Sequence, residues 1–489
     1  MRSALKATAM LGSSSLVTLV LGLVTAKVWA RLIGPAGYGH IGLLSSTVTL
    51  ISIVAELGLG TTIVRPTAVS IASDDRAEIL AIWRSATLIL LPLLAVIAIG
   101  MAIFRDTLAG FVLGQSGRAS EILCVIVMLC FGVTANLRTG LLNAHHKVKA
   151  LATMNIALNV VGTITALAFV VPLGTAGIAP SLAVSAAVRW VVVFVVLRQT
   201  TGLTFPHARA KWQHVRALLK HGLPVTGSMV VGPGVQILLP VVILHLVGEG
   251  SVGQYQAANT IAITLIGFLL VSMGQDFYPR VSAVGDDLAR LKTIAHDQHR
   301  LMLLLGLPLL LGIKWGSGWA VPLLLSPAFA PVIDILSWHL LGEMLRFSSV
   351  VFAYIVLARF SGLAFFGPAL VNGIALYLGT VLLVPACGVQ GVGMAFAITQ
   401  AVYLVLVASL VRWRFGWAFG GDGLLIAAGL LALVAPNFLP RGGMLRFSVE
   451  LSLALCAAAY SLWRLLAMWR SSATTIQETK HDQPQHTDA

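Results

Sequence analysis

The residues of this sequence with the clearest chemical potential are ionisable side chains that lie inside long apolar segments. A charge in the hydrocarbon layer of a membrane is costly, so such residues often mark a transport pathway or a structural ion pair. Both readings stay open for each residue. The candidates for cargo binding are Lys314, Arg346, Glu343, Lys27, Arg31, Glu56 and Arg189.

Three of these candidates lie near the middle of two consecutive apolar segments. Lys314 is 14 residues from the predicted inner end of one segment, and Glu343 and Arg346 are 15 and 12 residues from the inner end of the next. At about 1.5 Å per residue these depths match. We therefore expect Lys314 to pair with Glu343, and Glu343 and Arg346 to be neighbours at i,i+3 spacing. A lipid-facing lysine at that depth would be unfavourable, which favours a cavity-facing role.

The other candidates lie in the first half of the chain. Glu56 and Arg189 have similar predicted depths, so we expect a pair across the bundle, either structural or functional. Lys27 and Arg31 are one helical turn apart near the predicted outer end of their segment. Arg31, together with Arg84 and Arg138, can also extend its charge to the membrane surface.

The composition predicts an all-α polytopic membrane protein. Hydrophobic residues make up 58% of the 489 residues and charged residues 10%, against about 25% charged in soluble domains. Mean hydropathy is +0.92. Run length predicts about fourteen transmembrane helices. Their limits are 8–33, 40–64, 80–104, 119–143, 150–171, 176–198, 221–247, 252–277, 300–325, 331–358, 363–385, 389–411, 422–440 and 446–469.

The basic residues predict an orientation. With the N-terminus in the cytoplasm, 22 of the 32 Lys and Arg residues fall on inner segments, 5 on outer segments and 5 within spans. This bias follows the positive-inside rule, and it places both termini in the cytoplasm. The net charge of +14 is spread over many short loops, so nucleic acid is not an expected partner.

Two pairs of glycine turns indicate an internal repeat. The turn LIGPAGYGHI at 32–41 is similar to LVGEGSVGQY at 246–255, and VPLGTAGIA at 171–179 is similar to VPACGVQGVGMA at 384–395. Both pairs share an offset of 214 residues, with six spans between the copies. We therefore expect two six-helix bundles, 1–198 and 221–411, related by an axis along the membrane normal. Two additional helices occupy 412–470.

Two polar segments complete the predicted organisation. Residues 199–220 form a cytoplasmic linker in which HARAKWQHVRALLKH (207–221) reads as an amphipathic helix at the membrane surface, in contact with lipid. It can anchor to anionic lipid or attract a lipid phosphate. The tail 471–489 is polar and free of aromatic residues, and we expect it to be disordered.

Signals of catalysis are absent from the sequence. It has no Walker A loop, no H-E-x-x-H and no G-x-S-x-G motif, and its four cysteines have no metal or redox spacing. We therefore expect a transporter without catalytic residues, metal or cofactor.

The stretch KVWARLIGPAGYGHIGLLSSTVTLISIVAELGLGTTIVRP (27–66), with GLLNAHHKVKALATMN after the fourth span, resembles the polysaccharide flippases. These belong to the multidrug/oligosaccharidyl-lipid/polysaccharide exporter superfamily. The resemblance implies alternating access by two bundles, and an undecaprenyl-diphosphate-linked oligosaccharide as cargo in a bacterial inner membrane. It also implies a polysaccharide polymerase and a chain-length regulator as partners in an exopolysaccharide or O-antigen pathway.

Two other functions remain open at this point. A cation-coupled multidrug antiporter of the same superfamily would favour intramembrane acids, whereas this chain has more intramembrane Lys and Arg. A membrane polysaccharide polymerase would need a large outer loop, which the predicted topology lacks. If transport is coupled to protons or sodium, Glu56, Glu343 and Asp276 are the candidate sites.

Overall fold

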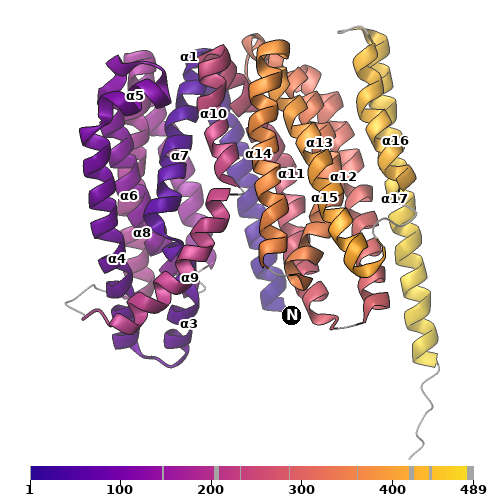
Figure 1. The fold of residues 1–489 in the computed structure, drawn as a ribbon, viewed down its shortest axis with the longest axis horizontal. Coiled ribbons are helices and arrows are strands. Elements are labelled where there is room, and N and C mark those ends of the chain that lie inside the picture. Colours follow the sequence, from indigo (N-terminus) through magenta and orange to yellow (C-terminus); the bar gives the residue numbers. More distant parts are fainter. Residues whose placement is uncertain are drawn as a thin grey trace, which may run out of the picture. The chain divides into compact units, whose positions relative to one another are not determined.

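The protein is helical throughout the described chain, as the sequence predicted (Figure 1). The structure is a computed structural model that describes residues 2–145, 148–202, 209–231, 233–285, 287–360, 362–417, 423–439 and 443–481. Within these ranges ten helical segments are long and apolar enough to cross a membrane, and Gly234–Val247 and Gly423–Phe438 are shorter apolar helices. The segment Ala150–Thr201 contains two antiparallel helices, α7 and α8, and α1 divides at a kink. The predicted fold, a polytopic helical membrane protein, is confirmed.

The α-helices follow one another with few residues between them. In chain order they are α1 (Arg2–Glu56), α2 (Leu59–Thr62), α3 (Val64–Ala72), α4 (Arg76–Ile103), α5 (Arg105–Leu113), α6 (Ala119–Ala144), α7 (Val148–Leu173), α8 (Ile178–Thr201), α9 (Trp212–Val231), α10 (Pro233–Val247), α11 (Glu249–Ala283), α12 (Leu288–Leu324), α13 (Pro331–Arg359), α14 (Gly362–Cys387), α15 (Gln390–Phe415), α16 (Gly423–Val434) and α17 (Met444–His481). Short 3₁₀ turns lie at Ser116–Arg118 (η1), Gly174–Gly177 (η2), Pro327–Phe329 (η3) and Ala435–Phe438 (η4).

The glycine turn between the first two predicted spans is a sharp break inside α1. Gly34 has φ 63° and ψ −169°, a conformation that glycine adopts without steric conflict, and Pro35 follows it. The N-terminus and α3 lie at the same end of the molecule in Figure 1, so the chain reverses direction within α1. The predicted spans 8–33 and 40–64 therefore form a helical hairpin joined at this break.

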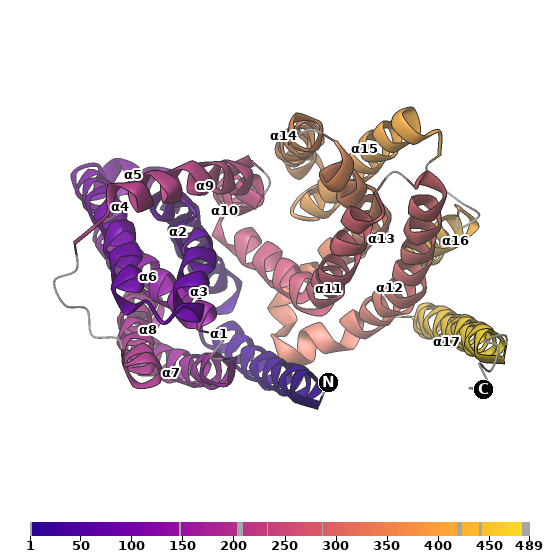
Figure 2. The ribbon, with the colours of Figure 1, turned by 90° about the horizontal axis from the view of Figure 1, so that it is seen from below.

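Close packing divides the chain into two compact units. Unit 1 contains Met1–Ala258, Val321–Val332 and Gly373–Val392, and unit 2 contains Asn259–Ala320, Ile333–Asn372 and Gly393–Ala489. In unit 1, α6 packs against α8 and α1, and α7 packs against α8 and α1; Figure 2 shows these helices nearly end-on. The division falls inside α11 rather than at 199–220. The predicted bundles, 1–198 and 221–411, follow from the sequence repeat, whereas the two units follow from packing. The division into units therefore does not test the bundles, which stay a prediction.

A reciprocal backbone contact joins the two similar glycine turns within unit 1. A side chain at Gly39 would collide with the carbonyl oxygen of Glu249, and one at Gly253 would collide with the carbonyl oxygen of Pro35. Residues 35 and 249, like 39 and 253, differ by the repeat offset of 214. Reciprocal contacts of this kind are typical of two copies facing each other across a two-fold axis.

The two predicted polar segments differ from expectation in where their helices begin and end. The linker helix begins at Trp212 and continues into the seventh predicted span as α9. Val215 and Leu218 are buried, and α9 packs against α4, whereas Trp212 is exposed. At the other end of the chain α17 extends to His481, so the expectation of disorder from residue 471 is wrong for 471–481. Residues 482–489 lie outside the described residues.

Candidate cargo-binding charges in the helices

Glu343 is the centre of a charged cluster on α13. Its side chain is 3% exposed, and its Oε1 lies 3.1 Å from Arg346 Nη1 and 3.5 Å from His339 Nε2. The i,i+3 and i,i+4 spacings on one helix produce this cluster, as predicted for Arg346. The His339 ring stacks on Phe396 of α15, with 4.0 Å between the ring centroids.

The two ends of this cluster differ in access. The Arg346 side chain is 36% exposed, whereas Glu343 Oε2 is buried without a hydrogen-bond partner among the described residues. A buried carboxylate with one free oxygen holds a neighbouring cation strongly, since that cation supplies its main compensation. Arg346 therefore combines a fixed position with a guanidinium that an anionic ligand can reach.

Lys314 does not join this cluster, so the predicted Lys314–Glu343 pair is wrong. Its Nζ donates to Asn437 Oδ1 at 2.7 Å and to Ser337 Oγ at 3.5 Å, and the residue is 3% exposed. Ser337 is six residues from Glu343 along α13, which is ~9 Å of helix. Counting residues gave the depth of each backbone position but not the face of the helix. Lys314 faces η4, whereas Glu343 lies beside His339, whose ring stacks on Phe396 of α15.

In unit 1, Glu56 and Arg189 are joined through a third residue. Asn136 of α6 donates from Nδ2 to Glu56 Oε1 at 2.6 Å, and its Oδ1 accepts from Arg189 Nη2 at 2.8 Å. The predicted association is present, but the amide relays it instead of a direct ion pair. Periodicity placed both charges at one depth and gave no sign of the intervening asparagine.

Three further cations of unit 1, Lys27, Arg31 and Arg138, have simpler surroundings. Lys27 is half-buried and Arg31 is exposed, and their four-residue spacing places them on one face of α1. Arg138 was expected to extend to the membrane surface, but its guanidinium carbon lies 4.4 Å from the centroid of the Trp190 ring. Arg138 Nε and Nη1 have no hydrogen-bond partner among the described residues, so this cation–π contact compensates part of the charge.

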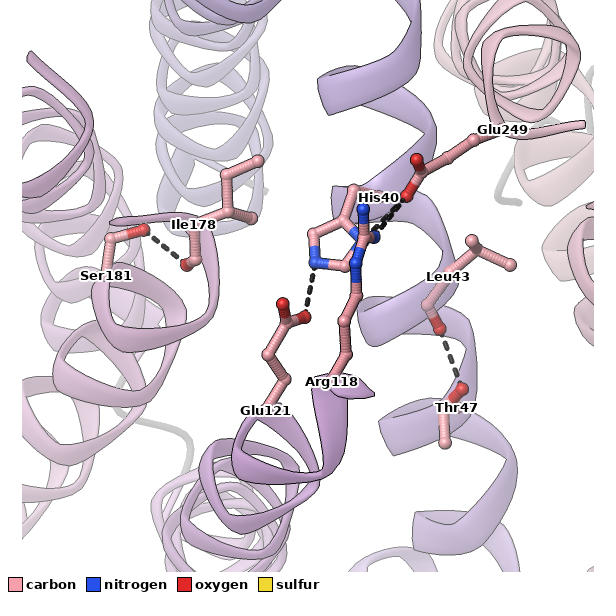
Figure 3. A network of polar contacts seen from close by, with 8 residues as sticks. All are labelled: His40, Leu43, Thr47, Arg118, Glu121, Ile178, Ser181 and Glu249. Atoms are coloured by element: carbon pink, nitrogen blue, oxygen red, sulfur yellow. Dashed lines mark hydrogen bonds and ion pairs between the residues drawn. The ribbon is translucent and has the colours of Figure 1, made fainter. Parts of the chain in front are cut away.

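A fourth polar network was missed by the sequence analysis (Figure 3). His40 is 3% exposed; its Nε2 lies 2.5 Å from Glu121 Oε2 and its Nδ1 2.9 Å from Glu249 Oε1. Arg118 Nη1 donates to the same Glu249 oxygen at 2.7 Å. The sequence did contain one sign of this network. Its four residues all lie at or beside the predicted outer ends of their spans: His40, Arg118, Glu121 and Glu249.

Comparison with solved structures identifies the fold. An inward closed conformation of the lipid II flippase MurJ superposes with a TM-score of 0.72 at 13% identity, covering 94% of this chain and 100% of that one. An inward-facing multidrug resistance MATE transporter of the MOP superfamily gives 0.68 at 16% identity, covering 82% of this chain and 98% of that one. The fold is therefore the one that these solved transporters share.

Sequence comparison then identifies the family. Residues 4–284 match the family of polysaccharide biosynthesis proteins, and the chain belongs to this family. Among characterised proteins it is similar to the lipid III flippase of Escherichia coli (strain K12) and to that of Shigella flexneri. Each is 22% identical over 427 residues, covering 84% of this chain and 98% of the flippase.

Proposed function

We propose that this protein is a flippase that moves an undecaprenyl-diphosphate-linked oligosaccharide from the inner to the outer leaflet of a bacterial inner membrane. The observation that carries the proposal is Arg346, a partly exposed guanidinium in a membrane-spanning helix, held by a buried carboxylate. A diphosphate crossing a low-dielectric layer needs cations to replace its hydration, and a guanidinium binds phosphate oxygens with two parallel hydrogen bonds. Similarity to lipid III flippases along 84% of the chain supports the same substrate class.

In the proposed cycle Glu343 holds Arg346 while no cargo is bound. An unpaired guanidinium in the membrane would be unfavourable, so the carboxylate stabilises the empty transporter. The cargo diphosphate then competes with Glu343 for Arg346. His339 stays within 3.5 Å of Glu343 Oε1 and can compensate the released carboxylate. The sugar crosses in a hydrated cavity, the lipid tail stays in the bilayer, and the transporter alternates between inner and outer openings.

The biological setting belongs to the same proposal. Both termini face the cytoplasm, because the basic residues are concentrated on the segments that the even span count places inside. The cargo feeds exopolysaccharide or O-antigen synthesis, with a polysaccharide polymerase and a chain-length regulator acting after translocation. Multidrug transport is the competing function, since MATE transporters share the fold.

The test is export by variants of Arg346 in a strain that lacks the native gene. Arg346→Ala should lower surface polysaccharide about tenfold or more per amount of membrane protein, since a charge-assisted hydrogen bond contributes about 1.5–3 kcal/mol. Arg346→Lys should keep part of the activity. The matched control is Arg280→Ala, because Arg280 forms an exposed i,i+4 pair with Asp276.

The same strains separate the two functions. Resistance to cationic drugs should not change when the protein is removed or when Arg346 is substituted. Normal polysaccharide export by Arg346→Ala, or a loss of drug resistance without a loss of polysaccharide, would overturn the flippase proposal.

A further inference from the structure

The His40 network is a buried titratable site that the proposed cargo cycle does not use. It joins three elements of unit 1: the second half of α1, the start of α6 with η1, and the first turn of α11 (Figure 3). The predicted topology places this end of the helices outside. Its contacts join residues that are 78 to 209 positions apart in the sequence, so only the fold brings them together.

The carboxylates on both sides of the His40 ring favour a proton on each ring nitrogen. Nε2 faces a carboxylate oxygen of Glu121, and Nδ1 faces a carboxylate oxygen of Glu249. Ionised carboxylates only accept hydrogen bonds, so an imidazolium ring, which donates from both nitrogens, satisfies both of these contacts. Arg118 Nη1 lies 3.0 Å from Nδ1 and donates to the same Glu249 oxygen. In a neutral ring with its proton on Nε2, Nδ1 would instead accept from Arg118.

The charges balance only in this protonated state. Imidazolium and guanidinium carry two positive charges, and Glu121 and Glu249 carry two negative charges. Removing the proton leaves a ring lone pair opposite a carboxylate, and a net charge of −1, at a residue that is 3% exposed. An uncompensated charge and two facing acceptors are unfavourable in a low-dielectric site. One bound proton therefore stabilises the arrangement of His40, Glu121 and Glu249, in addition to the Arg118–Glu249 ion pair.

The first turns of α11 are the element that this proton holds. Glu249 is the first residue of α11, and four residues later Gly253 packs directly on the Pro35 carbonyl of α1. Beyond Ala258 the same helix continues into unit 2. A change in the contacts of Glu249 therefore acts on a helix that contains residues of both units.

We propose that His40, Glu121 and Glu249 form a proton-binding site, in which the bound proton holds the start of α11 against α1 and α6. Release of the proton to water at this end of the helices removes one contact between His40 and a carboxylate. The first turns of α11 can then separate from α1 and α6. The link between this step and transport rests on the proposed function, whereas the proton site does not. A metal ion is not the expected occupant, because no group of three His, Cys, Asp or Glu residues within the described chain could hold one.

Hydrogen–deuterium exchange on the purified protein in lipid nanodiscs, without cargo, tests the site. Exchange of the peptide at 249–258 should be slow near pH 6 and faster near pH 8, after correction for the intrinsic rate. Its protection should fall by up to about tenfold per pH unit above the titration point. His40→Gln should exchange fast at both values, and His40→Arg, a permanent cation, should stay protected at both.

The matched control is His245→Gln, since His245 is an exposed histidine that contacts the Phe111 carbonyl in the same unit. It should keep the pH dependence of the wild type. If His40→Gln loses protection across the whole chain, that variant is unfolded. The pH dependence of the wild type and of His40→Arg then tests the proton site. A pH-independent wild-type profile, or an unchanged pH dependence in His40→Gln or His40→Arg, would overturn the proton site and leave the flippase proposal untouched.

Discussion

At the scale of single residues, Lys314 and Arg346 of unit 2 have different surroundings. Arg346 is partly exposed beside a buried carboxylate, whereas Lys314 is buried between α12, α13 and η4. We infer that Lys314 is a positioning residue that holds η4. Lys314→Ala and Asn437→Ala should then lower export together, each with a matching loss of membrane protein or of its thermal stability. Removing one partner of a buried charged hydrogen bond costs about 1–3 kcal/mol.

Two further variants separate this role from direct cargo binding. Asn437→Asp should keep both protein level and export, because a carboxylate accepts from Lys314 as the amide does. If Lys314→Ala instead abolishes export at a normal protein level while Asn437→Ala exports normally, Lys314 binds cargo directly, as the sequence pattern first indicated.

At the scale of elements, the contact between α1 and α11 depends on two glycines. A Cβ at Gly253 would meet the backbone of Pro35 and Gly39, which cannot move as a side-chain end can. Gly253→Ala should therefore destabilise the protein by about 1–3 kcal/mol, the usual range for overpacking. It should do so although alanine favours a helix over glycine by about 0.5–1 kcal/mol. The measurement is the thermal unfolding midpoint in detergent.

Gly250→Ala is the matched control on the same helix. A Cβ at Gly250 meets no atom within 4 Å, so this variant should be neutral or slightly stabilising. Equal midpoints for both variants would show that the close approach of α1 and α11 does not contribute to stability.

At the scale of the whole molecule, the prediction concerns topology. Reporter fusions after residues 36, 115 and 442 should read outside the membrane, and fusions after 75, 212 and 288 should read inside. The reason is the concentration of basic residues on one set of segments, 22 against 5. A fusion at the C-terminus should read inside, and an outside reading there would overturn the count of fourteen spans.

The sequence by itself determined the class of fold, because each span must bury its own backbone hydrogen bonds in lipid and therefore appears as a long apolar helix. It also determined the hairpin break at Gly34, since only glycine adopts that conformation without strain. The Glu343–Arg346 pair followed from spacing on a single helix. These features are local, so the residues that cause them are close together in the chain.

Only the tertiary structure decided which side chains meet between helices. Hydrophobic runs fix the depth of a residue, but in helices that are apolar on every face they do not fix its direction. Lys314 therefore contacts Asn437 rather than Glu343, and Asn136 lies between Glu56 and Arg189. His40 meets Glu249 across 209 residues for the same reason, because the packing of α1 against α11 is a property of the whole fold.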